Sequence, residues 1–184
     1  ATFMRGIDYV QIPTTLLAMV DSSIGGKTAI NLSKGKNMVG SFHNPQAVFC
    51  DLGFLDTLPV RHFNAGLMEI IKYGLILDAS FYSFIVKNRD SIAVRNKDTI
   101  ARLVYRCCRL KAEIVAQDEK DKGIRSILNF GHTVGHALES YTGYSVYLHG
   151  EAVALGSLAI IRYLVEKVVL RRQFLEEFEG TLDF

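Results

Sequence analysis

Three of the five histidines lie close together, in the segments NFGHTVGHALES and YLHGEAVA. His132 and His136 are four residues apart, so on a helix they share one face. His149 precedes the next predicted helix and can close on the same point. With one carboxylate, such a set would make a catalytic zinc site, in which three protein ligands leave a position open for substrate. The spacing therefore predicts metal binding, but it does not say which of the three histidines bind.

A second ionisable pair, Glu69 and Lys72, lies three residues apart in the apolar segment NAGLMEIIKYG. The simplest interpretation is an ion pair on a solvent-exposed helix face. However, the neighbouring residues are apolar, so this helix has little polar face to expose. Because buried charges need partners or a metal, we favour a functional role for both residues.

The segment DSSIGGKT, residues 21–28, matches a phosphate-binding loop only in part. That motif requires a glycine where Asp21 stands and a strand directly before it, whereas here a helix is predicted. What remains is a glycine turn that presents Lys27 beside Asp21, followed by a second turn with Lys36. Lysines on such turns suit phosphate or carboxylate oxygens. Taken alone, these two turns would fit equally well with exposed loop lysines that bind no ligand.

The elements that must position these residues change in character near Pro59. Before it, the pattern predicts a helix that begins at Thr14, and short strands at residues 9–12, 29–31, 38–42 and 47–52. After it, the helical spacing of apolar residues predicts helices at about residues 67–75, 100–114, 124–141 and 151–170. The segment from Lys111 to Lys122 is interpreted as a solvated helix end. An α/β part at residues 1–58 followed by an all-helical part at residues 59–184 indicates two domains.

Composition limits the class of protein. The 184 residues carry 21 Lys and Arg against 19 Asp and Glu, and this balance favours neither a nucleic-acid nor a membrane partner. The three cysteines form no disulfide framework and suit a reducing compartment. We therefore expect a cytoplasmic globular protein. Since the sequence begins without Met and ends without a helix stop signal, we expect it to be a piece of a longer polypeptide.

Taken together, these segments resemble one family, the 3-dehydroquinate synthases of the sugar-phosphate cyclase superfamily. The resemblance is carried by five segments in the family's order: MRGIDYVQIPTTLLAMVDSSIGGKTAIN, GKNMVGSFHNP, AGLMEIIKYG, DKGIRSILNFGHTVGHALE and LHGEAVALG. They cover most of residues 5–156. Within the superfamily, DSSIGGKT is more similar to dehydroquinate synthases than to their relatives in antibiotic pathways.

The resemblance implies the end of a Rossmann-like NAD-binding α/β domain followed by an all-α metal-binding domain, with the active site between them. The family's zinc ligands correspond to Glu69, His132 and His149, with cobalt as an alternative metal. The implied NAD contacts are Thr14, Thr15, Asp21, Lys27, Lys36, Phe54, Leu55, Asp56 and Thr57. The implied catalytic and substrate-binding residues are Lys72, Arg125, Asn129, His136, Asn37 and Arg5. Arg5 would reach the substrate phosphate across the interface of a homodimer.

The implied activity is that of an NAD- and zinc-dependent carbon–oxygen lyase. It converts 3-deoxy-D-arabino-heptulosonate 7-phosphate to 3-dehydroquinate and phosphate, a step of the shikimate pathway toward aromatic amino acids. Family members are about twice this length, so we expect the segment alone to bind NAD weakly and to be inactive. Three alternatives stay open: a sister cyclase for another sugar phosphate, a metal-dependent polyol dehydrogenase, and a non-catalytic metal-binding module.

Overall fold

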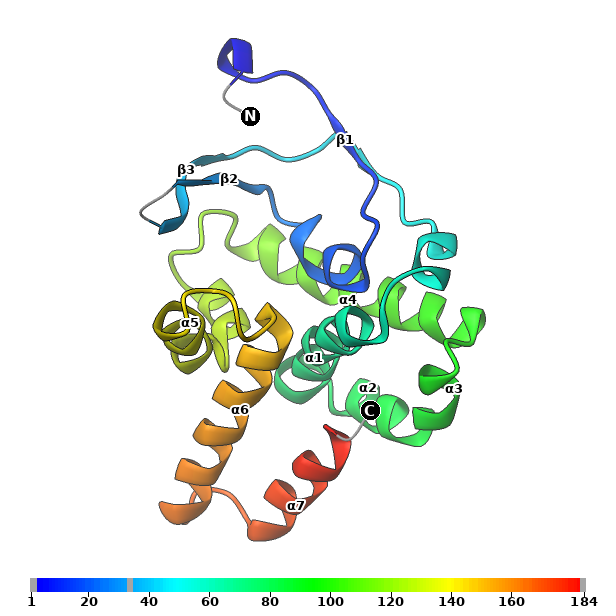
Figure 1. Cartoon of the computed structure of the whole chain (residues 1–184), viewed down its shortest axis with the longest axis vertical. Coiled ribbons are helices and arrows are strands. Elements are labelled where there is room, and N and C mark those ends of the chain that lie inside the picture. The colour runs from blue at the N-terminus through cyan, green and yellow to red at the C-terminus, as the bar shows by residue number, and fades with distance from the viewer. Residues whose placement is uncertain (1–2, 33–34, 183–184) are drawn as a thin grey trace.

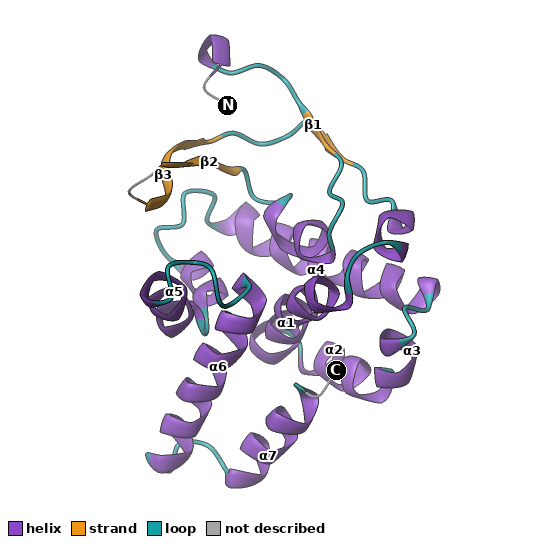
Figure 2. Cartoon of the chain, viewed as in Figure 1, coloured by secondary structure: helices purple, strands orange, loops and turns teal. Residues whose placement is uncertain are grey.

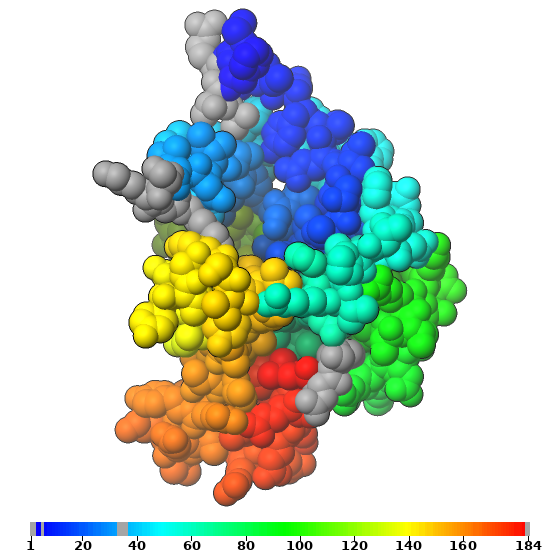
Figure 3. All heavy atoms as spheres, viewed as in Figure 1, coloured from blue at the N-terminus to red at the C-terminus, as the bar shows by residue number. Residues whose placement is uncertain are grey.

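The computed structural model describes residues 3–32 and 35–182 (Figure 1). The side chains of Arg5 and Lys36 lie outside the described part, so the roles assigned to them stay predictions. Strands occur in the N-terminal part and helices dominate the remainder (Figure 2). In the space-filling view, the N-terminal part caps one end of a helical body, and α7 lies near the other end (Figure 3).

The strands form two small sheets. β1 (Val10–Gln11) pairs in parallel with β4 (Ala47–Val48), in the register Val10 to Ala47. β2 (Lys27–Leu32) and β3 (Gly35–Phe42) form an antiparallel hairpin in which Lys27 faces Phe42. The predicted strand at 47–52 is therefore too long. Its second half instead leads into a 3₁₀ helix (Leu52–Asp56), because the Asp51 carboxylate accepts a hydrogen bond from the Gly53 amide and caps that turn.

The helical part holds seven α-helices within the described ranges. Their bounds are α1 Val60–Leu77, α2 Ala79–Lys87, α3 Arg89–Ala93, α4 Lys97–Gln117, α5 His132–Tyr141, α6 His149–Glu166 and α7 Arg172–Thr181. Of these, α2, α3 and α7 were not predicted. None of the helices in the described ranges has the length and apolar composition of a membrane span.

Two predicted helices differ from the structure. The helix expected from Thr14 is a short turn with π-helical geometry over Ala18–Ser22. The single helix expected over residues 124–141 is broken into a 3₁₀ helix (Ile124–Asn129) and α5. The break occurs at Gly131, whose φ of 79° is left-handed and excludes a continuous helix. The helical spacing of apolar residues continues across Gly131, and the sequence therefore predicted a single helix.

α1 is the central helix of the core and is buried along most of its length. It packs against α2, α4 and α6, which Figure 1 shows arranged around it. Phe63, Leu67, Ile70 and Ile71 on α1 are each no more than 2% exposed. Burying such side chains stabilises the fold by about 1.5–3 kcal/mol each. A helix that is apolar on all sides belongs in a core, and this placement takes Glu69 and Lys72 inside the protein.

Candidate metal centre and active-site cleft

Glu69 and Lys72 form a buried ion pair on α1. Their side chains are 0% and 2% exposed, which excludes the interpretation of a solvated surface pair. The Lys72 ammonium contacts Oε2 of Glu69, whereas Oε1 has no hydrogen-bond donor among the described residues. Burial raises the pKa of the Glu69 carboxyl above its usual range, although the Lys72 ammonium opposes this shift. Glu69 thus presents oxygen atoms with unused capacity to bind a cation.

His132 is the first residue of α5 and lies directly after the left-handed turn at Gly131. Its Nδ1 lies 3.2 Å from the carbonyl oxygen of Phe130, and its Nε2 lies 3.7 Å from Glu69 Oε1. Burial lowers the pKa of His132 to about 4, and the nearby Lys72 ammonium adds to this shift. The imidazole is therefore neutral at pH 7, which is the form that binds metals.

His149 opens α6 and approaches Glu69 from the other side. Its Nε2 lies 3.9 Å from Glu69 Oε1, and its Nδ1 lies 3.3 Å from the carboxylate of Glu139. The next residue, Gly150, packs directly on the backbone carbonyl of Ala65, one helical turn before Glu69. Any side chain at Gly150 would collide with that carbonyl. This close approach of α6 to α1 brings His149 to the cluster.

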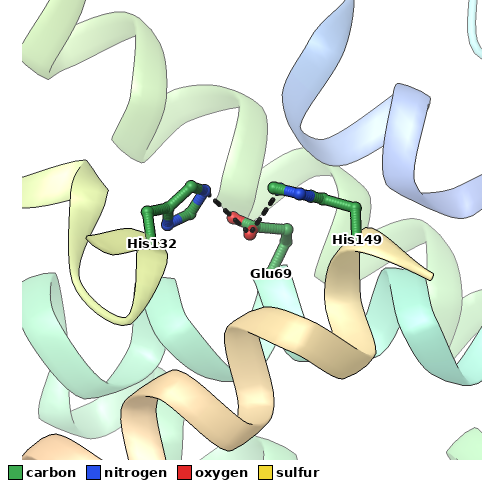
Figure 4. A group of neighbouring side chains, drawn as sticks. All are labelled: Glu69, His132 and His149. Carbon is green, nitrogen blue, oxygen red and sulfur yellow. Dashed lines mark ion pairs between the residues drawn. The ribbon is translucent and has the colours of Figure 1, made fainter. Parts of the chain in front are cut away.

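Together, Glu69, His132 and His149 fit a divalent metal (Figure 4). Their ligand atoms all lie within 4.8 Å of one another. Ligands about 2.0–2.2 Å from a tetrahedral ion would be about 3.4 Å apart, so only small movements are needed. Two histidines and one glutamate are a donor set of catalytic zinc sites. The geometry groups His132 and His149 with Glu69, but His136, Glu139 and His149 also have ligand atoms within 4.8 Å of one another. The assignment of the metal to Glu69, His132 and His149 therefore stays a prediction.

A cleft of about 580 Å³ opens beside this cluster. The predicted site residues that line it come from both the N-terminal part and the helices: Asp21, Lys27, Asn37, Lys72, Arg125, Asn129, His132, His136 and His149. Glu69 lies beneath the surface of the cleft, at 0% exposure. The cleft also holds the carboxylates Asp21, Asp121 and Glu139, so its lysines lie beside acidic partners. Its cations and amides are groups that can bind an anionic substrate.

Six of the predicted NAD contacts do not line this cleft: Thr14, Thr15, Phe54, Leu55, Asp56 and Thr57. Leu55 belongs to the core at 3% exposure, and Asp56 pairs with Lys97 at 3.1 Å. The Thr15 hydroxyl accepts a hydrogen bond from the Ala18 amide and so stabilises the start of the π-helical turn. The role of these six residues in binding NAD stays a prediction.

One prediction about the lysines is wrong, and it concerns Lys111. Lys27 and Asp21 both line the cleft, and Lys27 forms an ion pair with Asp121. Lys111 does not lie on a solvated helix end, because the residue is 6% exposed and its ammonium donates to the Asp21 carboxylate at 2.6 Å. A signal for this was present, since Lys111 follows the buried Cys107 by four residues on the apolar face of α4. Lys111 also lines the cleft and is a candidate site residue that the sequence pattern did not indicate.

Asp21 is the meeting point of three elements. Besides Lys111 from α4, the Tyr73 hydroxyl of α1 donates to the Asp21 carboxylate at 2.7 Å. Burial alone would raise the pKa of Asp21, but the ammonium groups of Lys111 and Lys72 outweigh it and hold that pKa well below 3.8. Asp21 is therefore ionised and joins the N-terminal part to two helices.

Arg125 is buried at the end of the cleft and is held by the backbone. Its guanidinium donates to the carbonyl oxygens of Glu119 at 2.7 Å and Gly25 at 2.9 Å. A guanidinium has five N–H donors in a fixed fork, so these bonds fix its orientation and leave donors for a ligand. Asn129 and His136 lie nearer the opening, where both residues are exposed.

The fold is that of the sugar-phosphate cyclases. It matches 2-epi-5-epi-valiolone synthase from Streptomyces hygroscopicus, solved with NAD⁺ and Zn²⁺ bound, with a TM-score of 0.90 and 28% identity over 98% of this chain. It also matches 2-deoxy-scyllo-inosose synthase in complex with carbaglucose-6-phosphate, NAD⁺ and Co²⁺, with a TM-score of 0.89 and 30% identity over 99% of this chain. The matches cover 51% and 49% of those proteins. The predicted fold class is confirmed.

Within this class, residues 1–65 match the N-terminal and residues 66–183 the C-terminal 3-dehydroquinate synthase family, so the chain belongs to the 3-dehydroquinate synthase family. It is 51% identical to the 3-dehydroquinate synthase of Desulforamulus reducens over 96% of this chain and 49% of that protein. It is 52% identical to that of Halorhodospira halophila over 100% of this chain and 52% of that protein. The chain thus spans about half the length of these relatives.

Proposed function

We propose that this chain forms the metal- and substrate-binding part of a 3-dehydroquinate synthase, a carbon–oxygen lyase of the shikimate pathway. The enzyme converts 3-deoxy-D-arabino-heptulosonate 7-phosphate to 3-dehydroquinate and phosphate. The observation that carries the proposal is the buried carboxylate of Glu69, which meets His132 and His149 beside a cleft lined by Lys72 and Arg125. Identity of 50–54% to several 3-dehydroquinate synthases supports this assignment over a sister cyclase.

Glu69, His132 and His149 would hold the metal, which we propose to be zinc or cobalt. When bound, the metal would supply Lewis-acid chemistry and make a substrate hydroxyl more acidic. His132 is already neutral at pH 7 and so is ready to bind without first losing a proton. Burial keeps water away from Glu69 and thereby strengthens its electrostatic interactions.

The cations of the cleft would bind the anionic groups of the substrate. Lys72 and Lys111 lie on one side, on α1 and α4, and Lys27 lies on β2. Arg125, with its fork already oriented by two carbonyl groups, suits bidentate binding of a carboxylate or phosphate. Lys72 lies one turn from Glu69, so the ammonium can hold an oxygen of a hydroxyl bound next to the metal. Held at both ends, the substrate would keep one orientation during elimination of phosphate.

NAD is the second cofactor that we propose for the enzyme. The pyrophosphate of NAD normally lies on a glycine-rich turn between a strand and a helix N-terminus. The described residues offer the two-stranded parallel sheet of β1 and β4, but within them no strand leads through such a turn into a helix. We therefore propose that NAD binding requires residues beyond those of this chain.

We further propose a homodimer that works in the cytoplasm. The hairpin supports an interface because Met38 and Phe42 lie on one face of β3 and are 62% and 47% exposed, an apolar face that a partner could cover. All three cysteines are free, which supports a reducing compartment. Light scattering of the full-length enzyme would give the oligomeric state, and a monomer would contradict this part of the proposal.

The test of the proposed function is substrate choice by a full-length enzyme that contains this segment. We expect it to release phosphate from 3-deoxy-D-arabino-heptulosonate 7-phosphate, to form 3-dehydroquinate and to accumulate no NADH. Faster turnover of sedoheptulose 7-phosphate or glucose 6-phosphate would instead indicate a sister cyclase. Release of NADH in bulk would indicate a polyol dehydrogenase. Zinc retention without turnover of any of these would indicate a metal-binding module.

A further inference from the structure

Glu139 is a buried carboxylate in the histidine-rich segment NFGHTVGHALES that has no role in the site described above. It follows His132 by seven residues on α5 and therefore lies on the same helix face. Its side chain is 3% exposed. Glutamate is almost never so deeply buried unless it is paired, because an isolated charge is costly in a dry interior. Its Oε2 lies 3.3 Å from Nδ1 of His149.

This contact determines which nitrogen of His149 carries the proton. When Glu139 is ionised, its carboxylate can only accept hydrogen bonds, and Nδ1 of His149 is then the donor. In the neutral imidazole, Nε2 then carries the lone pair. Nε2 is the atom that faces Glu69, at 3.9 Å. The hydrogen bond to Glu139 thus selects the tautomer that a metal at Glu69 requires, and it holds the ring in that direction.

His132 is oriented in the same way but by a different kind of acceptor. Its Nδ1 faces the backbone carbonyl of Phe130, and its Nε2 faces the same oxygen of Glu69. A carbonyl group fixes the tautomer, whereas a carboxylate also raises the basicity of the imidazole. The two histidines therefore present equivalent atoms to one point, and His149 has the stronger support.

We propose that Glu139 is a positioning residue that holds His149 as a metal ligand through Nδ1. This inference rests on the proposed metal site of Glu69, His132 and His149. The structure also brings ligand atoms of His136, Glu139 and His149 within 4.8 Å of one another, so Glu139 could instead be a ligand itself. The two arrangements compete for His149, and they differ in what removal of each carboxylate does to metal binding.

The test compares three variants of the purified protein by zinc competition with a chelator. Glu139→Leu removes the acceptor and should weaken zinc binding about 10–100-fold. Glu139→Gln keeps an oxygen that can accept from Nδ1 and should remain within about fivefold of wild type. Glu69→Gln removes a ligand and should weaken binding far more. Glu113→Leu, an exposed position on α4, is the matched control for loss of a carboxylate and should change nothing.

Absorption of the Co²⁺-loaded protein adds a readout that a purely structural role would not change. We expect Glu139→Leu to alter the cobalt spectrum and Glu139→Gln to preserve it. Wild-type zinc affinity in both Glu139 variants would overturn the inference. Loss of metal in both variants as complete as in Glu69→Gln would also overturn it, because Glu139 would then be a ligand. If Glu69→Gln itself bound zinc normally, the proposed metal site would fail as well.

Discussion

At the scale of single residues, Glu69 explains most about the site. It is a carboxylate at 0% exposure in an apolar helix, and Lys72 on the same helix compensates its charge. An ion pair alone does not explain why two charges are buried, since the cost of desolvating them can exceed their Coulombic attraction. The convergence of His132 and His149 on the same carboxylate supplies the missing reason, because a metal there would use all three side chains.

The first prediction concerns this carboxylate. Glu69→Gln should weaken zinc binding far more than His136→Ala, because only Glu69 belongs to the proposed ligand set. Metal analysis of the purified variants after dialysis measures this directly. Equal loss of zinc in the two variants would mean that the ligands are assigned wrongly.

Lys72 carries the second prediction. In a full-length enzyme, Lys72→Met keeps most of the side-chain length but removes the cation that faces the cleft. Loss of a charge-assisted contact in a closed site costs about 2.7–4 kcal/mol, so kcat/KM should fall on the order of 10²–10³-fold. Bound zinc should be retained. Lys87→Met, exposed on α2, is the control and should leave kcat/KM unchanged. A fall of less than about threefold for Lys72→Met would show that Lys72 has a structural role only.

At the scale of elements, the site depends on how closely helices approach each other. The break at Gly131 starts α5 at His132, and the contact of Gly150 with Ala65 seats α6 against α1. Neither feature follows from apolar periodicity, which predicted one helix through residue 131. The residue types of the site were predictable because histidines at this spacing are rare. How deeply the site residues are buried was not predictable. The pairing of Lys111 with Asp21, for example, depends on a contact between segments 90 residues apart.

The third prediction tests that contact. Lys111→Met should lower the free energy of unfolding by about 2–3 kcal/mol, because it leaves the Asp21 carboxylate without a charged donor. The pKa of Asp21 is lowered in the folded state, so this stabilisation is present above the ordinary value of 3.8 and is lost as the pH falls below it. Urea unfolding at several pH values should therefore show a difference from wild type that shrinks below pH 3.8.

Lys120→Met provides the control for this prediction, since Lys120 lies in the same segment and is exposed. We expect it to leave the free energy of unfolding unchanged at every pH. If Lys111→Met behaved like Lys120→Met, the pair with Asp21 would contribute nothing to stability. If its effect persisted undiminished in acid, the loss would come from packing of the lysine chain and not from its charge.

At the scale of the whole molecule, the cleft lies where two parts of the chain meet. Leu17, Asp21, Ser22, Lys27 and Asn37 come from the N-terminal part, and the remaining lining residues come from the helices and their connections. The family and the order of its segments were predictable from the sequence because five motifs occur together. The small size of the sheets was not predictable from the sequence. Strand propensity does not show how many residues pair with a neighbouring strand. The division into domains at residues 58 and 59 stays a prediction.

The fourth prediction concerns NAD. The described residues contain no strand–turn–helix unit with the glycines that bind a pyrophosphate. The 184-residue chain should therefore bind NAD weakly or not measurably, while it still binds zinc. Isothermal titration calorimetry of the zinc-loaded chain measures this. Micromolar affinity would show that these residues are sufficient for the cofactor.

The central claim is that one metal ion lies among Glu69, His132 and His149 at the floor of the cleft. A crystal structure of the zinc-loaded protein, with anomalous data collected on both sides of the zinc edge, tests it most directly. We predict one anomalous peak, with Glu69 Oε1 and the Nε2 atoms of His132 and His149 about 2.0–2.2 Å from it. A peak bound instead by His136 and Glu139, or no peak near Glu69 in zinc-loaded crystals, would contradict the account.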